Sequence, residues 1–159
     1  MFERKDYISW DRYFMGVALL SARRSKDPVT QVGACIVSPD KKIIGIGYNG
    51  FPSGISDQEY SWAKDEDYLN TKYPYVVHAE ANAILNATNN LKDTTLYVTL
   101  FPCNECAKLI IQSKIKEIVY LHDYKALDLS TLASKRMLES VGIKVRHMDF
   151  EDLILTSND

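Results

Sequence analysis

Two short stretches of this sequence hold the residue types that a catalytic zinc site needs. His78 stands two positions before Glu80, and a Pro-Cys-x-x-Cys run places Cys103 and Cys106 three positions apart. Zinc binds imidazole nitrogen and cysteine sulfur in a tetrahedron, and a catalytic zinc leaves its fourth position to water. We therefore predict a Zn²⁺ site whose protein ligands are His78, Cys103 and Cys106.

Glu80 is the candidate catalytic residue of this site. Zinc with two thiolates and a neutral imidazole has no net charge, so it acidifies water less than a site of three histidines does. A carboxylate that lies beside the metal without binding it can take the proton of the water and pass it to a ring nitrogen and a leaving amine. The pattern indicates hydrolysis at an amidine-like carbon with release of ammonia.

The Cys-x-x-Cys pair has other interpretations, because it is also typical of redox-active disulfides and of structural zinc sites. Redox chemistry is disfavoured by the missing Gly-Pro-type spacer and by the histidine upstream. A structural site needs a fourth ligand, and His122 and His147 are the only other histidines. We expect those two to be ordinary strand or surface residues, and Cys35 to be a small buried side chain.

The periodicity of the chain predicts an α/β fold that brings the zinc residues together. Helices are expected over residues 9–24, 79–89, 104–113 and 130–141, and strands over 31–38, 42–48, 94–99, 117–121 and 143–146. The first two strands form a hairpin, and the strand–helix alternation that follows implies a mixed sheet covered by helices. His78 and Cys103 then start two helices at one edge of the sheet, where open sheets bind their ligands.

Residues 50–77 form a long connection that is rich in aromatic side chains. Long loops are uncommon in compact domains and tend to serve as lids, binding loops or interface segments. Aromatic rings also need a surface to cover. We expect the segment to fold onto its own domain or onto a neighbouring subunit, with a substrate lid as the alternative. The aromatic residues concerned are Phe51, Tyr60, Trp62, Tyr68, Tyr73 and Tyr75.

Length and composition predict a single domain over residues 1–159. The hydrophobic share of 46% and the charged share of 25% are typical of soluble globular proteins. With 19 basic and 21 acidic side chains, the chain lacks the basic surface on which nucleic-acid binding depends. No apolar run suits a signal peptide or a membrane span. We therefore expect a cytoplasmic protein with no nucleic-acid or membrane partner.

At these residues the chain resembles the cytidine deaminase-like superfamily and, within it, the deoxycytidylate (dCMP) deaminase family. The combination of H-x-E with P-C-x-x-C is the known signature of zinc-dependent nucleobase deaminases. The narrower resemblance extends from about Tyr7 to about Val145. It rests on R-S-K-D-P at 24–28, Q-V-G-A at 31–34, G-I-G-Y-N-G-F-P at 45–52, T-K-Y-P-Y at 71–75, H-A-E-A-N-A-I at 78–84 and Y-V-T-L-F-P-C-N-E-C-A-K at 97–108.

The resemblance implies a three-layer α/β/α sandwich with a five-stranded mixed sheet, and hydrolysis of dCMP to dUMP for thymidylate synthesis. By analogy, the backbone N–H of Ala79 would meet the pyrimidine carbonyl, Asn49 would hold the sugar hydroxyl, and Pro102 would line the substrate site. Asn49 is equally well interpreted as a turn residue, because Asn-Gly is a strong turn signal. The candidate phosphate contacts are Arg24, Ser25, Lys26, Asn82 and Tyr124.

Members of this family are similar in forming homo-hexamers that dCTP activates and dTTP inhibits. The resemblance therefore implies a homo-oligomer with an effector site at Gly47, Tyr48, Asn49 and Gly50. The rival hypotheses are another zinc deaminase, acting on tRNA adenosine, free nucleosides or a riboflavin precursor, and a non-catalytic zinc-binding module. The acidic charge balance disfavours tRNA, and Glu80 disfavours the non-catalytic module.

Overall fold

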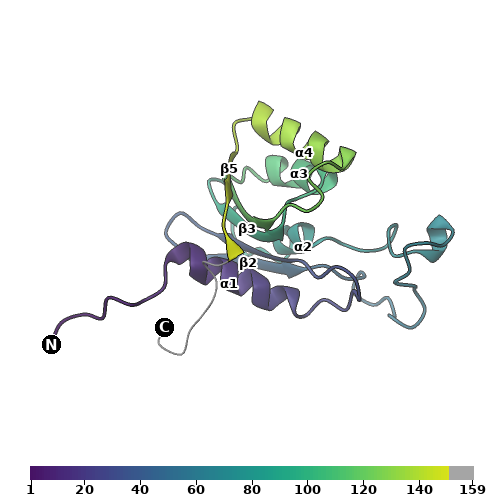
Figure 1. The fold of residues 1–159 in the computed structure, drawn as a ribbon, viewed down its shortest axis with the longest axis horizontal. Coiled ribbons are helices and arrows are strands. Elements are labelled where there is room, and N and C mark those ends of the chain that lie inside the picture. Colours follow the sequence, from purple (N-terminus) through teal and green to yellow (C-terminus); the bar gives the residue numbers. More distant parts are fainter. Residues whose placement is uncertain (151–159) are drawn as a thin grey trace.

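A five-stranded mixed sheet forms the centre of the computed structural model, which describes residues 1–150 (Figure 1). Its strands are β1 (Gly33–Val37), β2 (Ile43–Tyr48), β3 (Thr95–Leu100), β4 (Glu117–His122) and β5 (Lys144–His147), in the order β2-β1-β3-β4-β5. β1 pairs antiparallel with β2 and β3, whereas β3, β4 and β5 are parallel. The predicted hairpin and mixed sheet are confirmed. A predicted frayed end at 157–159 lies outside the described residues.

Helices cover both faces of the sheet and make three layers (Figure 1). They are α1 (Trp10–Ala22), α2 (Ala79–Leu85), α3 (Asn104–Gln112) and α4 (Leu129–Ser140). Successive residues of β1 point to opposite faces of the sheet. Cys35 packs with Phe14 of α1, while Ile36 packs with the core under α2, α3 and α4. The predicted α/β/α sandwich is therefore confirmed. Within residues 1–150, no helix combines the length and the apolar character needed to cross a membrane.

The helix that carries His78 and Glu80 is shorter than the sequence predicts. We expected it to run to residue 89, but α2 ends at Leu85. The backbone N–H of Thr88 donates instead to the carbonyl of Ile44, at 3.2 Å. The open edge of β2 thus supplies the hydrogen-bond partner that a further helical turn would have supplied.

The direction of the strands explains how the two zinc-binding stretches meet. β2 and β3 are each antiparallel to β1, so they run the same way and end at the same edge. Cys103 follows the end of β3 after two residues. On the other side, Gly50 and Val77 exchange two backbone hydrogen bonds, of 3.1 and 2.9 Å, and His78 comes next. The predicted convergence of two helix starts is confirmed.

Residues 50–77 extend away from the sheet and carry a short 3₁₀ helix, η1 (Tyr68–Asn70) (Figure 1). Four aromatic side chains of this loop pack on one another. The Phe51 and Trp62 rings stack with 4.1 Å between centroids, and Tyr60 meets Tyr75 edge-on at 4.7 Å. The loop therefore covers part of its own aromatic surface, and its use as an interface or a lid stays a prediction.

Candidate active site

The three predicted zinc ligands lie together at the starts of α2 and α3. His78 Nδ1 is 3.4 Å from Cys103 Sγ and 3.4 Å from Cys106 Sγ. All three ligand atoms lie within 4.8 Å of one another. Zinc bonds of about 2.3 Å to sulfur and about 2.0 Å to nitrogen place tetrahedral ligands roughly 3.5 Å apart. The donor atoms and their spacing therefore fit a zinc ion.

Local backbone structure explains why these side chains converge. His78 and Cys103 are both N-cap residues with extended backbone, at φ −73° and ψ 157° and at φ −72° and ψ 174°. Pro102 precedes Cys103, is buried, and suits a chain that leaves a strand. Cys106 lies one turn into α3, on the same face as Cys103.

The remaining candidate metal ligands lie elsewhere. His147 Nε2 is 3.1 Å from the carbonyl oxygen of Leu121, and the His122 ring stacks on Phe150. Within residues 1–150, neither histidine belongs to a group of potential ligands of the kind that His78 joins. Cys35 is fully buried in β1, and burial raises the pKa of its thiol to about 12. It is therefore suited to packing and not to thiolate chemistry.

The two cysteine thiols shift each other's pKa in opposite directions. The hydrogen bond from Cys106 lowers the pKa of the Cys103 thiol to about 3, and His78 contributes in the same direction. That same hydrogen bond, together with burial, raises the pKa of the Cys106 thiol. The hydrogen bond with Cys103 also raises the pKa of His78. Two sulfurs and a nitrogen that compete for protons can instead bind a divalent metal, which then takes the place of the protons.

Glu80 lies in the first turn of α2 with only 4% of its surface exposed. Burial raises the pKa of its carboxyl group, while the charge on His78 opposes that rise. Its side chain also hydrogen-bonds with Cys106. His78, by contrast, is exposed. The Glu80 carboxyl group is therefore shielded from solvent, whereas the ligand group is open to solvent at His78.

The Asn49 side chain hydrogen-bonds to the backbone of the segment that precedes β1. Its Oδ1 accepts the N–H of Val32 at 2.8 Å, and its Nδ2 donates to the carbonyl of Thr30 at 2.9 Å. Ser25 Oγ donates to the carbonyl of Asn49 at 2.9 Å. These contacts support the structural interpretation of Asn49. Its contact with a sugar hydroxyl stays a prediction.

Two of the other candidate phosphate residues already have partners within the chain. Lys26 pairs with Asp57 of the long loop, and Asn82 Nδ2 donates to the carbonyl of Tyr48 at 2.8 Å. Arg24 and Tyr124 are exposed. Within residues 1–150, no hydrogen bond or ion pair joins either of them to another candidate, so a phosphate pocket stays a prediction.

The G-Y-N-G segment spans the end of β2 and the turn that follows it. Gly47 is buried under α2, Tyr48 is exposed, and Gly50 pairs with Val77. Its effector role stays a prediction. These contacts do place the segment in direct backbone contact with Val77, the residue before His78.

Two features of this region were not predicted from the sequence. The charge of Lys125 lies close enough to His78 to oppose the rise in its pKa. Asp27 and Lys72 form a buried ion pair. Both members of that pair stand in motifs on which the resemblance rests, R-S-K-D-P and T-K-Y-P-Y. The charge of each residue inside its motif was the one signal in the sequence that could have drawn attention to the pair.

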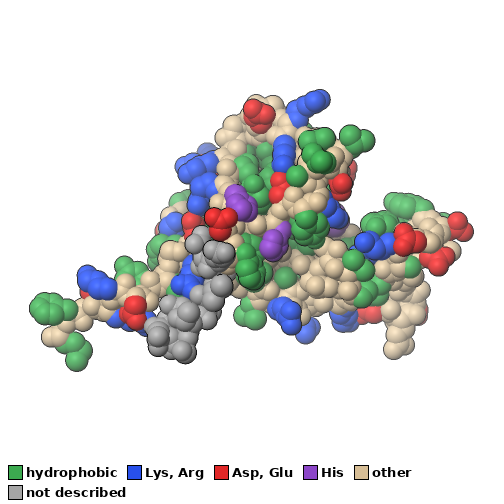
Figure 2. All heavy atoms as spheres, in the orientation of Figure 1, with side chains coloured by type: hydrophobic (Ala, Val, Ile, Leu, Met, Phe, Trp, Pro, Cys, Tyr) green, Lys and Arg blue, Asp and Glu red, His purple; other side chains and the backbone are tan. Residues whose placement is uncertain are grey.

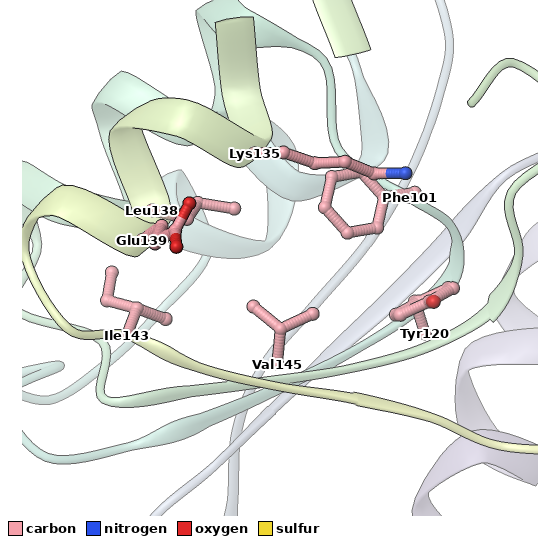
Figure 3. Close-up of a pocket in the computed structure, with 7 residues that line it drawn as sticks. All are labelled: Phe101, Tyr120, Lys135, Leu138, Glu139, Ile143 and Val145. Carbon is pink, nitrogen blue, oxygen red and sulfur yellow. The ribbon is translucent and has the colours of Figure 1, made fainter. Parts of the chain in front are cut away.

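A hollow of about 310 Å³ lies between α4 and the sheet (Figure 3). Lys135 extends over the Phe101 ring there, with 5.1 Å from Nζ to the ring centre. The lining residues are Phe101, Tyr120, Lys135, Leu138, Glu139, Ile143 and Val145. None of them is a zinc ligand or Glu80, so the candidate active site is identified by its ligand geometry and not by this cavity.

The surface does not favour a polyanionic partner on the face that Figure 2 displays. Basic and acidic side chains both occur over the core and over the projecting loop (Figure 2). This distribution agrees with the net charge of −2.

Comparisons with known proteins agree with this site. Residues 8–122 match the family described as the cytidine and deoxycytidylate deaminase zinc-binding region. The chain is 56% identical to a probable deoxycytidylate deaminase of Drosophila melanogaster, over 91% of this chain and 74% of that protein. It is 53% identical to the deoxycytidylate deaminase of Homo sapiens, over 91% and 82%.

A solved structure is also similar to this chain. The dCMP deaminase of cyanophage S-TIM5, in complex with dCMP and dUMP, superposes with a TM-score of 0.72 and 26% identity, over 92% of this chain and 100% of that one. A family match across most of the chain and two relatives above half identity agree with the ligand geometry. The chain therefore belongs to the cytidine and deoxycytidylate deaminase family, whose deoxycytidylate deaminases it resembles most specifically.

Proposed function

We propose that this protein hydrolyses dCMP to dUMP and ammonia, with Glu80 as its proton carrier. The observation that supports this most strongly is the placement of His78 Nδ1 at 3.4 Å from both cysteine sulfurs, with the buried Glu80 carboxyl group beside Cys106. The name of the cyanophage relative, whose complex holds dCMP and dUMP, supports the choice of substrate.

The ligand residues and Glu80 divide the chemistry between them. His78, Cys103 and Cys106 would hold the zinc ion, which when bound would supply an acidified water as the nucleophile. Glu80 takes one proton from that water and passes it to the ring nitrogen, and then takes the second proton from the newly formed hydroxyl group and passes it to the leaving amine. A C–O bond forms and the C–N bond breaks at the carbon that bears the amino group. The products dUMP and ammonia account for all atoms of dCMP and water.

The chain also offers groups that could hold the rest of the nucleotide. The backbone N–H of Ala79 is at the first position of α2, where a helix leaves its amides without intrahelical acceptors. We assign it to the pyrimidine carbonyl, with Pro102 beside the ring and Asn49 at the sugar. The phosphate would meet residues drawn from Arg24, Ser25, Lys26, Asn82 and Tyr124. Lys125, whose charge reaches His78, is an additional candidate.

Regulation by dCTP as activator and dTTP as inhibitor forms part of the proposal. The supporting observation is the pair of hydrogen bonds between Gly50 and Val77, because they give a ligand on the G-Y-N-G segment a short path to His78. The dUMP produced would serve thymidylate synthesis in the cytoplasm.

A homo-hexamer is the proposed assembly. Exposed apolar side chains on α1 and η1 support association, because an interface would remove their surface from water. They include Trp10, Tyr13, Leu20, Tyr68 and Leu69.

The test is ammonia release from a panel of four substrates: dCMP, CMP, deoxycytidine and an adenosine stem-loop. Each is assayed alone, with dCTP and with dTTP. The proposal predicts preference for dCMP, activation by dCTP and inhibition by dTTP. Release from the stem-loop in preference to dCMP would favour the tRNA hypothesis. Zinc binding without release from any substrate would favour a non-catalytic module.

A further inference from the structure

Asp27 and Lys72 form a buried ion pair that the proposed chemistry does not use. The two residues are 45 positions apart, and their side chains are only 2% and 8% exposed. Charges removed from water are costly unless each is paired and well hydrogen-bonded. A pair buried to this degree therefore fixes the chain segments that carry it.

Asp27 organises the segment that follows α1. Its Oδ1 accepts the backbone N–H groups of Val29 and Thr30, at 2.9 and 3.1 Å. Its Oδ2 accepts Lys72 Nζ and, at 3.5 Å, Asn49 Nδ2. One carboxylate thus connects the turn after α1, the end of β2 and the end of the long loop.

Lys72 organises the chain that leads into His78. Its carbonyl accepts the N–H groups of Tyr75 and Val76, at 3.1 and 3.0 Å, so it closes the turn after η1. Val77 then pairs with Gly50 through two backbone hydrogen bonds. The ion pair is therefore linked to His78 by a continuous series of short contacts.

We propose that Asp27 and Lys72 are positioning residues that hold His78 at the metal site and Asn49 at the nucleotide site. Neither touches the zinc ligands or the reacting atoms. Their action is indirect, since together they set the relative placement of the G-Y-N-G segment and the chain before His78. The inference rests on the proposed function only for its activity measurement, because the placement of His78 can be measured through zinc itself.

The experiment uses the zinc-loaded full chain and the variant Lys72→Gln, which leaves the Asp27 carboxylate buried without its cation. Zinc release to a chromogenic chelator, the Michaelis constant for dCMP and the melting temperature are measured together. We expect zinc release at least about tenfold faster than in the wild type, as for other residues that orient a ligand. The Michaelis constant should rise as well, because Asp27, which contacts the Asn49 side chain, is no longer held by Lys72.

Two further variants separate positioning from general destabilisation. Asp27→Asn/Lys72→Gln replaces the ion pair by two amides that can bond each other, and it should return zinc release close to the wild-type rate. Asp57→Asn is the matched control, because it breaks the pair with Lys26 between the same two segments, where Lys26 is 68% and Asp57 33% exposed. It should leave zinc release unchanged.

The inference is overturned if Lys72→Gln lowers only the melting temperature, with wild-type zinc release and Michaelis constant. It is also overturned if the double variant folds and still releases zinc as fast as the single variant. Asp27→Asn, whose Oδ1 can keep the contacts to Val29 and Thr30, is the second variant and is judged by the same measurements if Lys72→Gln does not fold. A wild-type protein that holds zinc but does not deaminate dCMP contradicts the proposed function and leaves the zinc-release test intact.

Discussion

Gly47 of β2 lies directly against the backbone of Ala79 in α2. A Cβ atom at Gly47 would come within 2.3 Å of the Ala79 carbonyl oxygen and within 2.3 Å of the Ala83 nitrogen. Real Cβ atoms do not approach backbone so closely. The missing side chain therefore lets α2, with His78 and Glu80 at its start, rest on the sheet.

Gly47→Ala should displace α2 and with it the zinc ligand and the proton carrier. Both neighbouring atoms belong to backbone and cannot rotate away, so we expect a loss of about 1–3 kcal/mol in the free energy of unfolding. Zinc retention should fall with it. Urea denaturation and zinc content measure the two effects.

Gly16→Ala is the matched control for that substitution. Gly16 lies inside α1, and apart from that helix no atom lies within 4 Å of the position that a Cβ atom would take there. Alanine should therefore stabilise the helix by up to about 1 kcal/mol. A Gly47→Ala protein with wild-type stability and full zinc would contradict the close-packing account of Gly47.

Glu80→Gln should keep zinc and lose turnover. Glutamine matches the shape of the buried carboxyl group but cannot accept a proton from water. We expect deamination to fall by roughly 10²–10⁴, the usual contribution of general acid–base catalysis. Metal content and ammonia release from the same preparation decide the outcome. Turnover near the wild-type rate would remove Glu80 from the mechanism.

Arg24→Ala should affect the nucleotide more than the nucleoside. If Arg24 meets the phosphate, its loss raises the Michaelis constant for dCMP and has little effect on deoxycytidine deamination. Arg23→Ala is the control, because Arg23 is the exposed neighbour at the end of α1. Equal effects of Arg24→Ala on both substrates would show that this side chain does not bind phosphate.

Arg146 joins β5 to α1 and should make stability depend on pH. Its guanidinium group donates to both carboxylate oxygens of Asp11, at 2.8 and 3.0 Å, and this hydrogen bonding lowers the pKa of Asp11. A lowered native pKa contributes stability above the ordinary aspartate pKa of about 4, and that stability is lost as the pH falls through the lowered value. The two side chains are 35% and 36% exposed, so solvent screening limits the contribution at pH 7 to about 1 kcal/mol.

Urea denaturation of Arg146→Met at pH 7 and at pH 3 measures that contribution. The difference from the wild type should be present at pH 7 and smaller at pH 3, where the Asp11 carboxylate takes up protons. Lys144→Met is the control, since Lys144 is 3.8 Å from Glu117 and largely exposed. A difference that grows towards low pH would contradict the assigned ion pair.

The sequence was sufficient for the parts of the site that chemistry restricts to few residue types. Zinc needs sulfur and nitrogen donors at short spacing, so His78, Cys103 and Cys106 could be predicted as a group without a structure, and the structure brings them together. The strands could be located as well, because buried strands are continuous runs of apolar residues such as those around Ile36.

Contacts between distant residues could not be predicted in the same way. Lys72 meets Asp27 across 45 positions, and although each is a charged residue inside a motif, the sequence does not show that they pair. The end of α2 at Leu85 likewise depends on a hydrogen bond to β2, which only the folded chain supplies. Asn49 illustrates both cases, because Asn-Gly marks the turn but not the bond to Val32.

The most direct test of the account is the zinc K-edge X-ray absorption spectrum of the purified, active protein. The account predicts two sulfur ligands at about 2.3 Å and nitrogen or oxygen ligands at about 2.0 Å. The nitrogen belongs to His78, and the oxygen belongs to solvent. A spectrum with four sulfur ligands, or an active protein without zinc and with a disulfide between Cys103 and Cys106, would contradict it.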